Sequence, residues 1–102
     1  MVQYNLTILY MYQITPYTKS QAKKFGVDVK PSTRKGKKID VFDKEGDKLA
    51  SIGALGMGDY PTFQRTKGKA FADKRREAYK ARHEKDLKKK ETPGFWANAL
   101  LW

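Results

Sequence analysis

Cysteine is absent from this sequence of 102 residues, and histidine occurs once, at position 83. Without cysteine, the chain has neither a disulfide framework nor a thiolate metal site. His83 has no cysteine to act with, and no serine lies in a recognisable nucleophile motif. Because catalysis usually requires a base and a nucleophile, paired carboxylates or a metal, we expect a protein that is not an enzyme and uses no cofactor or metal.

Charge is absent from the first fourteen residues. They are too few for a transmembrane helix and lack the basic start of a signal peptide, so we expect no transmembrane segment. Apolar and polar residues alternate along them, which is typical of a strand. Residues 1–14 are a strand of the domain's own sheet, a poorly ordered leader, or an arm that pairs with a neighbouring protein through Tyr4, Leu6 and Ile8. Residues 15–102 are expected to form one small domain.

Positive charge, by contrast, is abundant. Lys and Arg number 22 against 11 Asp and Glu, which gives a net charge of +11. Residues 17–38 and residues 62–102 each carry +7, whereas residues 39–61 carry −3. Two basic blocks around a slightly acidic middle favour nucleic acid, anionic lipid or an acidic protein surface as the partner, without choosing among them.

The first basic block has weak signals of regular structure. Residues 20–25 predict one or two helical turns that end at Gly26, and residues 27–29 predict a short strand. Residues 31–37 have the composition of a loop, and the basic cluster there is either solvated or in contact with an anionic partner. Candidate nucleic-acid contacts in the whole chain are Arg34, Lys35, Lys37, Lys38, Lys80, Lys88, Lys89 and Lys90.

Two short alternating runs flank a glycine-bearing turn and predict a β-hairpin over about 38–53. The turn contains three acids, Asp43, Glu45 and Asp47. Their odd spacing is like that of a calcium loop, but the long loop and the closing glutamate of such a site are missing. Turn geometry and solubility therefore explain these acids better than metal binding does.

Two prolines mark the starts of the helices that follow. Pro61 and Pro93 each come shortly after a residue that can cap a helix. We expect a long helix over about 61–90 and a short helix over about 93–102. The predicted fold class is α+β: a small antiparallel sheet, with a possible extra strand from the N-terminus, covered on one face by the long helix.

The long helix has an apolar stripe that contains two arginines. At about 100° per residue, Phe71 and Tyr79 share one narrow face with two alanines, and Arg75 and Arg82 fall on the same face. An unpaired buried charge is costly. The arginines therefore lie along the core with their charged groups in water, pair with carboxylates such as Asp86, or face a partner.

The C-terminal residues are aromatic and uncharged apart from the terminal carboxylate. Phe95, Ala99 and Trp102 lie on one side of the expected helix, and Trp96 extends that side. A helix this short is marginal alone, so it must dock on another surface. That surface belongs either to its own domain or to a partner that accepts an exposed hydrophobic plug.

Several uncommon steps occur in order between residues 38 and 102. They are Asp59-Tyr60, Arg75-Arg76, Tyr79, Arg82-His83, Gly94-Phe95-Trp96 and Leu100-Leu101-Trp102. In these steps the chain resembles a family of small basic proteins encoded by large nucleocytoplasmic DNA viruses. It departs from that family because related sequences often carry more tryptophan between the helices and continue past the last tryptophan. Residues 1–14 also have no counterpart there.

The resemblance implies a virion component but no reaction. It implies a location in the virion and, during assembly, in the host cytoplasm or nucleus. It also implies a shared framework, for folding or for docking, that consists of Arg75, Tyr79, Arg82, Phe95, Trp96 and Trp102.

Two functions are compatible with the sequence. The first is a non-enzymatic viral structural protein, a minor capsid or virion component that bridges larger viral proteins, with their acidic surfaces as candidate contacts. The alternative is a basic nucleic-acid-binding or genome-packaging protein, which the charge of +11 motivates. Against it, the chain has no helix-turn-helix, zinc-finger or RNA-recognition signature, and acids are interspersed along the basic helix. Partner-binding candidates for the first function are Tyr4, Leu6, Ile8, Arg75, Tyr79, Arg82, Phe95, Trp96 and Trp102.

Overall fold

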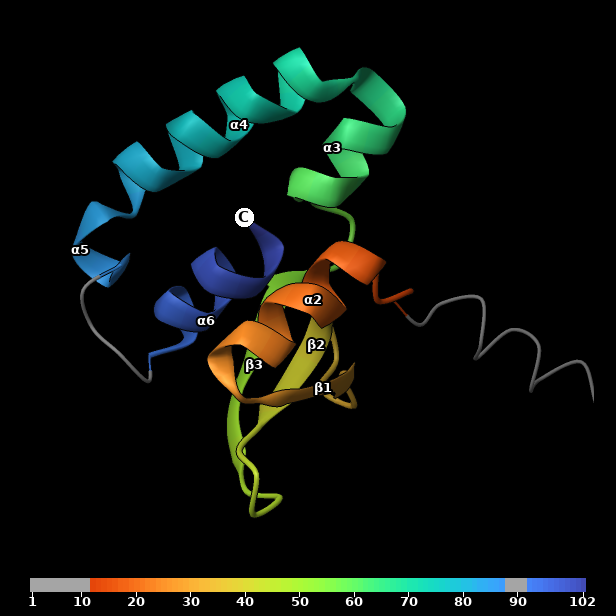
Figure 1. Ribbon diagram of the computed structural model, residues 1–102, viewed down its shortest axis with the longest axis vertical. Helices are drawn as coiled ribbons and strands as arrows, with labels where there is room; N and C mark the ends of the chain where they lie inside the picture. The colour runs from red at the N-terminus through yellow and green to blue at the C-terminus, as the bar shows by residue number, and fades with distance from the viewer. Residues whose placement is uncertain (1–11, 88–91) are drawn as a thin grey trace, which may run out of the picture.

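The computed structural model describes residues 12–87 and 92–102. A three-stranded antiparallel sheet packs against two helices, and a further run of helices arches over them (Figure 1). The strands are β1 (Asp28–Pro31), β2 (Lys37–Phe42) and β3 (Lys48–Ala54). The helices are α2 (Pro16–Phe25), α3 (Tyr60–Lys67), α4 (Lys69–Arg82), α5 (Glu84–Leu87) and α6 (Pro93–Leu101). The predicted α+β class is confirmed. From here on, α3, α4 and α5 together are called the arm, a name that no longer refers to residues 1–14.

The hairpin predicted over about 38–53 is present as β2 and β3. Ile39 pairs with Ile52, and Val41 pairs with Ala50, so their side chains share one face of the sheet. Because side chains alternate along a strand, this register places the apolar residues of both strands together.

The third strand is β1, which pairs antiparallel with the other edge of β2. It corresponds to the short strand predicted at residues 27–29. Residues 12–14, the end of the predicted N-terminal strand, belong to no strand, and residues 1–11 lie outside the described residues.

The core lies between the sheet, α2 and α6. Ile39 of β2 and Leu100 of α6 are both fully buried. Because α6 is apolar on most of its sides, it has the composition of a helix that is enclosed by protein. The C-terminal helix therefore docks on its own domain. The buried core cluster consists of Ala22, Val27, Ile39, Val41, Ala50, Ile52, Trp96, Ala99, Leu100 and Leu101.

The arm differs from the single helix expected over about 61–90. Gly68 separates α3 from α4 with φ 90 and ψ 165, a conformation that is strained for any residue with a side chain. Its N–H still bonds the Gln64 carbonyl at 3.2 Å and closes α3. α4 ends at Arg82, with His83 as its C-cap, and residues 88–90 lie outside the described residues. The chain therefore bends twice and arches away from the sheet (Figure 1), which α2 and α6 cover in its place.

The helix starts follow the capping pattern. Thr15, Asp59 and Thr92 are N-caps whose side chains accept a hydrogen bond from an N–H three residues on. A proline in the first turn follows each cap. α2 begins directly after Thr15, so it is longer than the helical turns predicted at 20–25, and Gly26 ends it with φ 69.

Candidate functional site

A buried ion pair joins the arm to the sheet. Lys38 Nζ of β2 lies 2.8 Å from Asp59 Oδ2, and the two side chains are 5% and 1% exposed. The Tyr12 hydroxyl donates to the same oxygen at 2.6 Å, and the Thr62 N–H donates to Asp59 Oδ1 at 3.0 Å. A buried charge is tolerated only when it is paired and hydrogen-bonded. This network therefore fixes the point at which α3 leaves the sheet.

Burial and hydrogen bonding shift the pKa values of Asp59 and Tyr12. Burial raises the pKa of Asp59, but hydrogen bonds from Lys38, Thr62 and Tyr12 outweigh burial and hold that pKa below its ordinary value. Burial, together with the hydrogen bond to Asp59, raises the pKa of Tyr12 above its ordinary value. At neutral pH, Asp59 is therefore anionic and Tyr12 is protonated. Such groups suit a structural anchor better than proton transfer.

Contacts between aromatic rings connect the arm to the C-terminal end of α6. Trp102 stacks on Tyr79, with ring centroids 4.5 Å apart and planes inclined by 10°. Tyr79 also stacks on His83 at 4.3 Å, and Phe63 of α3 lies 6.1 Å from Trp102. A Cβ at Gly58 would overlap the Phe63 ring, so glycine permits this approach. Since each aromatic pair contributes about 0.5–1.5 kcal/mol beyond its buried area, the stack holds α4 in place over α6.

A cleft of about 260 Å³ opens between the arm, the β3–α3 loop and α6. We call it the arm cleft. The basic and aromatic residues that line it are Lys38, Arg75, Tyr79, Arg82, His83 and Trp102.

Among the side chains that line the arm cleft, the uncompensated charge is positive. Asp59 and Lys38 line it but neutralise each other. Arg75 and Arg82 are exposed and take part in none of the ion pairs between described side chains; the side chain of Asp86, the carboxylate predicted as a partner, is not among those described. The Arg75 guanidinium lies 5.3 Å from the centre of the Phe63 ring. Arg75 and Arg82 thus both border the cleft with exposed side chains, where an anionic group can reach them.

The predicted partner-binding residues divide into two groups. Arg75, Tyr79, Arg82 and Trp102 meet at the arm cleft. Trp96 is buried in the core, and both Phe95 and Trp96 contact Phe25 edge-on, at 6.0 Å and 6.2 Å between ring centroids. These two residues hold α6 against α2. Tyr4, Leu6 and Ile8 lie outside the described residues.

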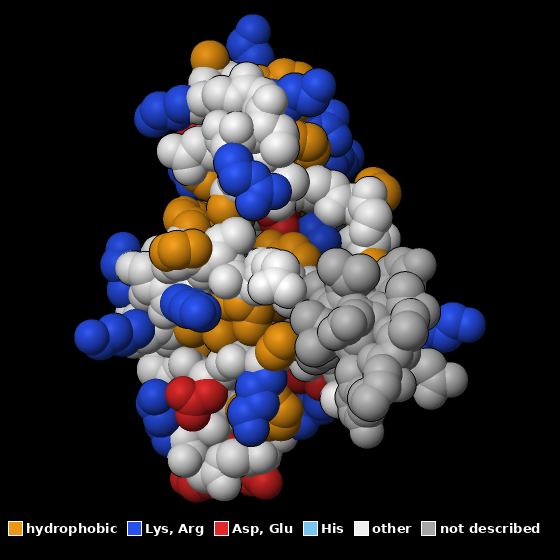
Figure 2. Space-filling model, turned by 90° about the vertical axis from the view of Figure 1, so that its right-hand side faces the viewer, with side chains coloured by type: hydrophobic (Ala, Val, Ile, Leu, Met, Phe, Trp, Pro, Cys, Tyr) orange, Lys and Arg blue, Asp and Glu red, His pale blue; other side chains and the backbone are white. Residues whose placement is uncertain are grey.

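The candidate nucleic-acid contacts are spread over different elements. Lys38 is buried in its ion pair and cannot reach a phosphate backbone, whereas Arg34 and Lys35 are exposed and Lys37 is half-buried. Lys80 is half-buried on α4 and donates to Asn98 Oδ1 at 2.9 Å. Figure 2 shows Lys and Arg side chains at several places on one face, with apolar side chains between them. Lys88, Lys89 and Lys90 lie outside the described residues.

Sequence reasoning missed Met57 and the pairing of Lys38 with Asp59. The cap position of Asp59 could be read from the following proline, but nothing in the pattern pairs it with a lysine 21 residues earlier. Met57 lines the arm cleft and is 66% exposed. The glycines around it gave the only signal, since they indicate a loop that crosses from the sheet to the arm.

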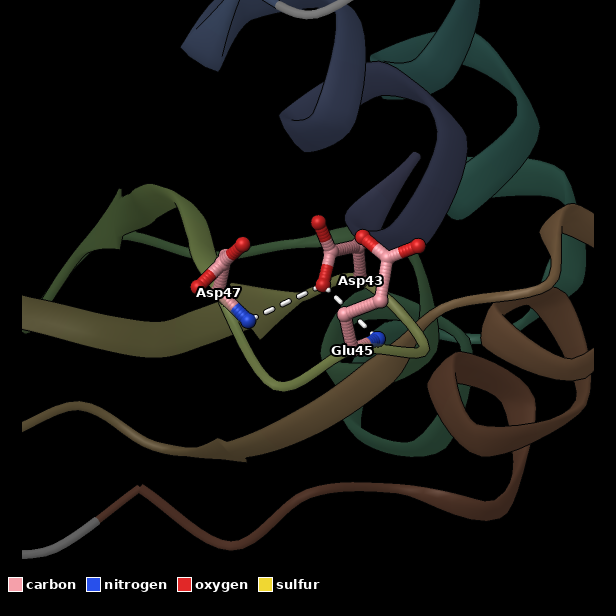
Figure 3. Close-up of side chains that lie close together, drawn as sticks. All are labelled: Asp43, Glu45 and Asp47. Atoms are coloured by element: carbon pink, nitrogen blue, oxygen red, sulfur yellow. Dashed lines mark hydrogen bonds between the residues drawn. The ribbon is translucent and has the colours of Figure 1, made fainter.

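The acidic hairpin turn has its own structural role (Figure 3). Asp43 Oδ1 accepts hydrogen bonds from the N–H groups of Glu45 and Asp47, at 3.0 Å and 2.9 Å. Ligand atoms of the three acids lie within 4.8 Å of one another, and two of the acids are exposed. Asp43 thus serves the turn geometry that its position predicts, and a solvated acidic cluster alone assigns no metal.

No family model, curated protein or solved structure matches this chain. Within residues 12–87 and 92–102, no helix has the length and apolar composition needed to cross a membrane. The viral resemblance of residues 38–102 therefore stays a prediction.

Proposed function

We propose that the protein is a non-enzymatic structural protein, a minor capsid or virion component that bridges larger proteins by binding an acidic segment of one of them in the arm cleft. The observation that carries the binding site is the exposure of Arg75 and Arg82 beside a formed cleft. The virion assignment is supported by the resemblance of residues 38–102.

The partner segment must combine acidic and apolar side chains. Beside the two arginines, Met57 is 66% exposed and Phe71 is 42% exposed. Phe71 packs on Phe63 at 5.4 Å between ring centroids, so it continues the aromatic surface under Arg75. Arginine, methionine and aromatic residues are enriched at interface cores, where arginine binds carboxylates in a two-pronged geometry. Aspartate or glutamate next to a leucine or phenylalanine therefore fits this surface.

A labelled peptide of alternating glutamate and leucine provides the test. We expect Arg75→Gln/Arg82→Gln to weaken its binding, measured by fluorescence anisotropy at physiological salt, by about tenfold or more, because charge-assisted hydrogen bonds are lost. The matched control is Lys67→Gln/Lys74→Gln, which removes the same charge from exposed positions of the arm. Equal losses in both double variants, or no binding by the natural protein, would refute the cleft as the site.

Nucleic-acid binding is the second candidate, and the arm favours it through exposed cations outside the arm cleft. These are Arg65, Lys67, Lys69, Lys74 and Lys85. Asp73, Glu77 and Glu84 are interspersed with them and weaken a phosphate-facing surface. Titration of random-sequence duplex DNA from low to physiological salt separates the two functions. Binding that persists, with a log-log slope of several released counterions, would replace the protein-bridging proposal; loss of binding before physiological salt would support it.

A further inference from the structure

A second hollow lies on the other flank of α4, between that helix, α2 and α6. Its volume is about 280 Å³. Trp102 lines both this hollow and the arm cleft. The polar residues that line the second hollow are Tyr17, Gln21, Arg76, Lys80 and Asn98.

Two cations share this hollow, and its lining contains no acidic side chain. Arg76 and Lys80 are one helical turn apart on α4, and both are half-buried. Asp73 lies one helical turn before Arg76, but its two oxygens accept from the Tyr60 hydroxyl at 2.9 Å and from Lys69 Nζ at 2.6 Å, and Glu77, which is next to Arg76 in the sequence, is exposed. Like charges placed together away from bulk water repel each other, which favours a bound anion between them.

Several hydrogen-bond donors in the hollow are unused. Arg76 Nε has no hydrogen-bond partner among the residues that the structure describes, but it is not one of these donors, because it is too buried to be reached from the hollow. The Arg76 guanidinium lies 3.4 Å from the centre of the Tyr60 ring, and its Nη2 donates to the Tyr17 hydroxyl at 3.3 Å. Tyr17 therefore accepts from Arg76 and keeps its own proton to donate. Lys80 has three N–H donors and gives one to Asn98 Oδ1.

We propose that this hollow is a binding site for a phosphate group, held by Arg76, Lys80 and the Tyr17 hydroxyl. A phosphate carries close to two negative charges at neutral pH and several acceptor oxygens. It therefore matches two cations and convergent donors better than a single carboxylate does. Phe25 and Trp102 form aromatic parts of the wall, which suit the organic portion of a phosphate monoester.

The lysine responds to this environment in the expected direction. Burial lowers the pKa of Lys80 below its ordinary value, and the charge of Arg76 lowers it further. A bound phosphate would reverse that shift, because it stabilises the ammonium form. Binding at neutral pH should therefore raise the pKa of Lys80.

The test is NMR titration of the full chain with inorganic phosphate, against sodium chloride at matched ionic strength. We expect saturable shifts of the Asn98 side-chain amide and the Trp102 indole N–H with phosphate alone. Lys80→Gln should weaken phosphate binding at least about tenfold. The control Lys74→Gln removes the same charge from an exposed position of α4 and should leave binding unchanged. Phenyl phosphate distinguishes the source: tighter binding than inorganic phosphate indicates a monoester, and equal binding indicates the free ion.

Two outcomes would overturn the proposal. One is that chloride produces the same shifts; the other is that Lys80→Gln retains full affinity. If Lys80→Gln does not fold, the residues whose signals shift in the natural protein locate the binding site instead. Shifts confined to the exposed loop of Arg34 and Lys35 would exclude this hollow. The double variant Arg75→Gln/Arg82→Gln should bind phosphate normally, so the failure of one site is distinguishable from the failure of the other.

Discussion

The sheet side of the molecule and the arm are held together by different kinds of contact. Between the sheet, α2 and α6, fully buried aliphatic side chains such as Ile39, Ile52 and Leu100 form the core. In α4, by contrast, Ala72 is the buried residue. The arm depends on ring stacking, on cations over rings and on the ion pair between Lys38 and Asp59. Apolar burial has no preferred direction, whereas stacking and ion pairing specify distance and angle.

This difference separates stability from recognition. The sheet side supplies the non-directional burial that drives folding. The arm carries cations on both flanks of α4, exposed at Arg75 and Arg82 and half-buried at Arg76 and Lys80. Surfaces that bind partners are commonly drawn from the less stable parts of a fold, and both sites proposed above include residues of α4. The following predictions test this division, from the largest expected effect to the smallest.

The largest effect is expected where the two regions join. Lys38→Met removes the partner of Asp59 and leaves a buried carboxylate with two neutral donors, so we expect a loss of about 3–5 kcal/mol in the free energy of unfolding. Urea denaturation measures this loss. Hydrogen exchange should show that α4 amides become much less protected than β2 amides, because the arm loses its anchor while the core remains.

Two further variants check the cause. Lys35→Met removes an exposed lysine from the same basic block and should change stability little. Lys38→Met/Asp59→Asn removes both charges and should regain part of the loss, since no unpaired charge stays buried. If Lys38→Met costs no more than Lys35→Met, the ion pair is not the anchor, and the aromatic stack alone must hold the arm.

A smaller effect is expected from a buried charge within the sheet itself. Burial raises the pKa of Asp40, but hydrogen bonds from Ser32, Ser51, Thr33 and Lys48 outweigh burial and lower that pKa from 3.8 to about 2. Because the folded-state pKa is the lower one, this stabilisation is present above pH 3.8 and is lost as the pH falls toward 2. It amounts to roughly 2 kcal/mol.

Unfolding free energies measured across that pH range check this prediction. Asp40→Asn should flatten the acid limb of the stability curve, although it also costs about 1–3 kcal/mol at neutral pH through imperfect hydrogen bonding. An unchanged acid limb would show that other carboxylates, such as Asp59, control acid unfolding. The sheet side and the arm would then differ less in their stability at low pH than their contacts suggest.

The sequence predicted the sheet side well and the arm less well. The hairpin and α6 could be predicted because alternation, caps and an apolar helix are local signals. The break at Gly68 could not, since an isolated glycine is tolerated in a helix and its left-handed conformation depends on tertiary packing. Whether α6 or the longer helix covers the sheet depends on which of the two packs against it in the folded chain, and local patterns do not show this. The site was predicted in part: Arg75 and Arg82 stood out as charges in an apolar stripe, but their relation to Met57 required the fold.

The smallest effect is expected at those same two arginines. If Arg75 and Arg82 belonged to the folding framework, alanine at either position would lower the melting temperature clearly. Both are exposed, so we expect Arg82→Ala to change stability by less than about 0.5 kcal/mol. Arg75→Ala should cost about 0.5–1 kcal/mol, because the guanidinium lies over Phe63.

Thermal denaturation monitored by circular dichroism measures both changes. A loss of several kcal/mol at either position would place that arginine among the contacts that hold the arm, and its effect on peptide binding would then report unfolding. Near-native stability combined with weaker peptide binding would instead assign the charge to recognition.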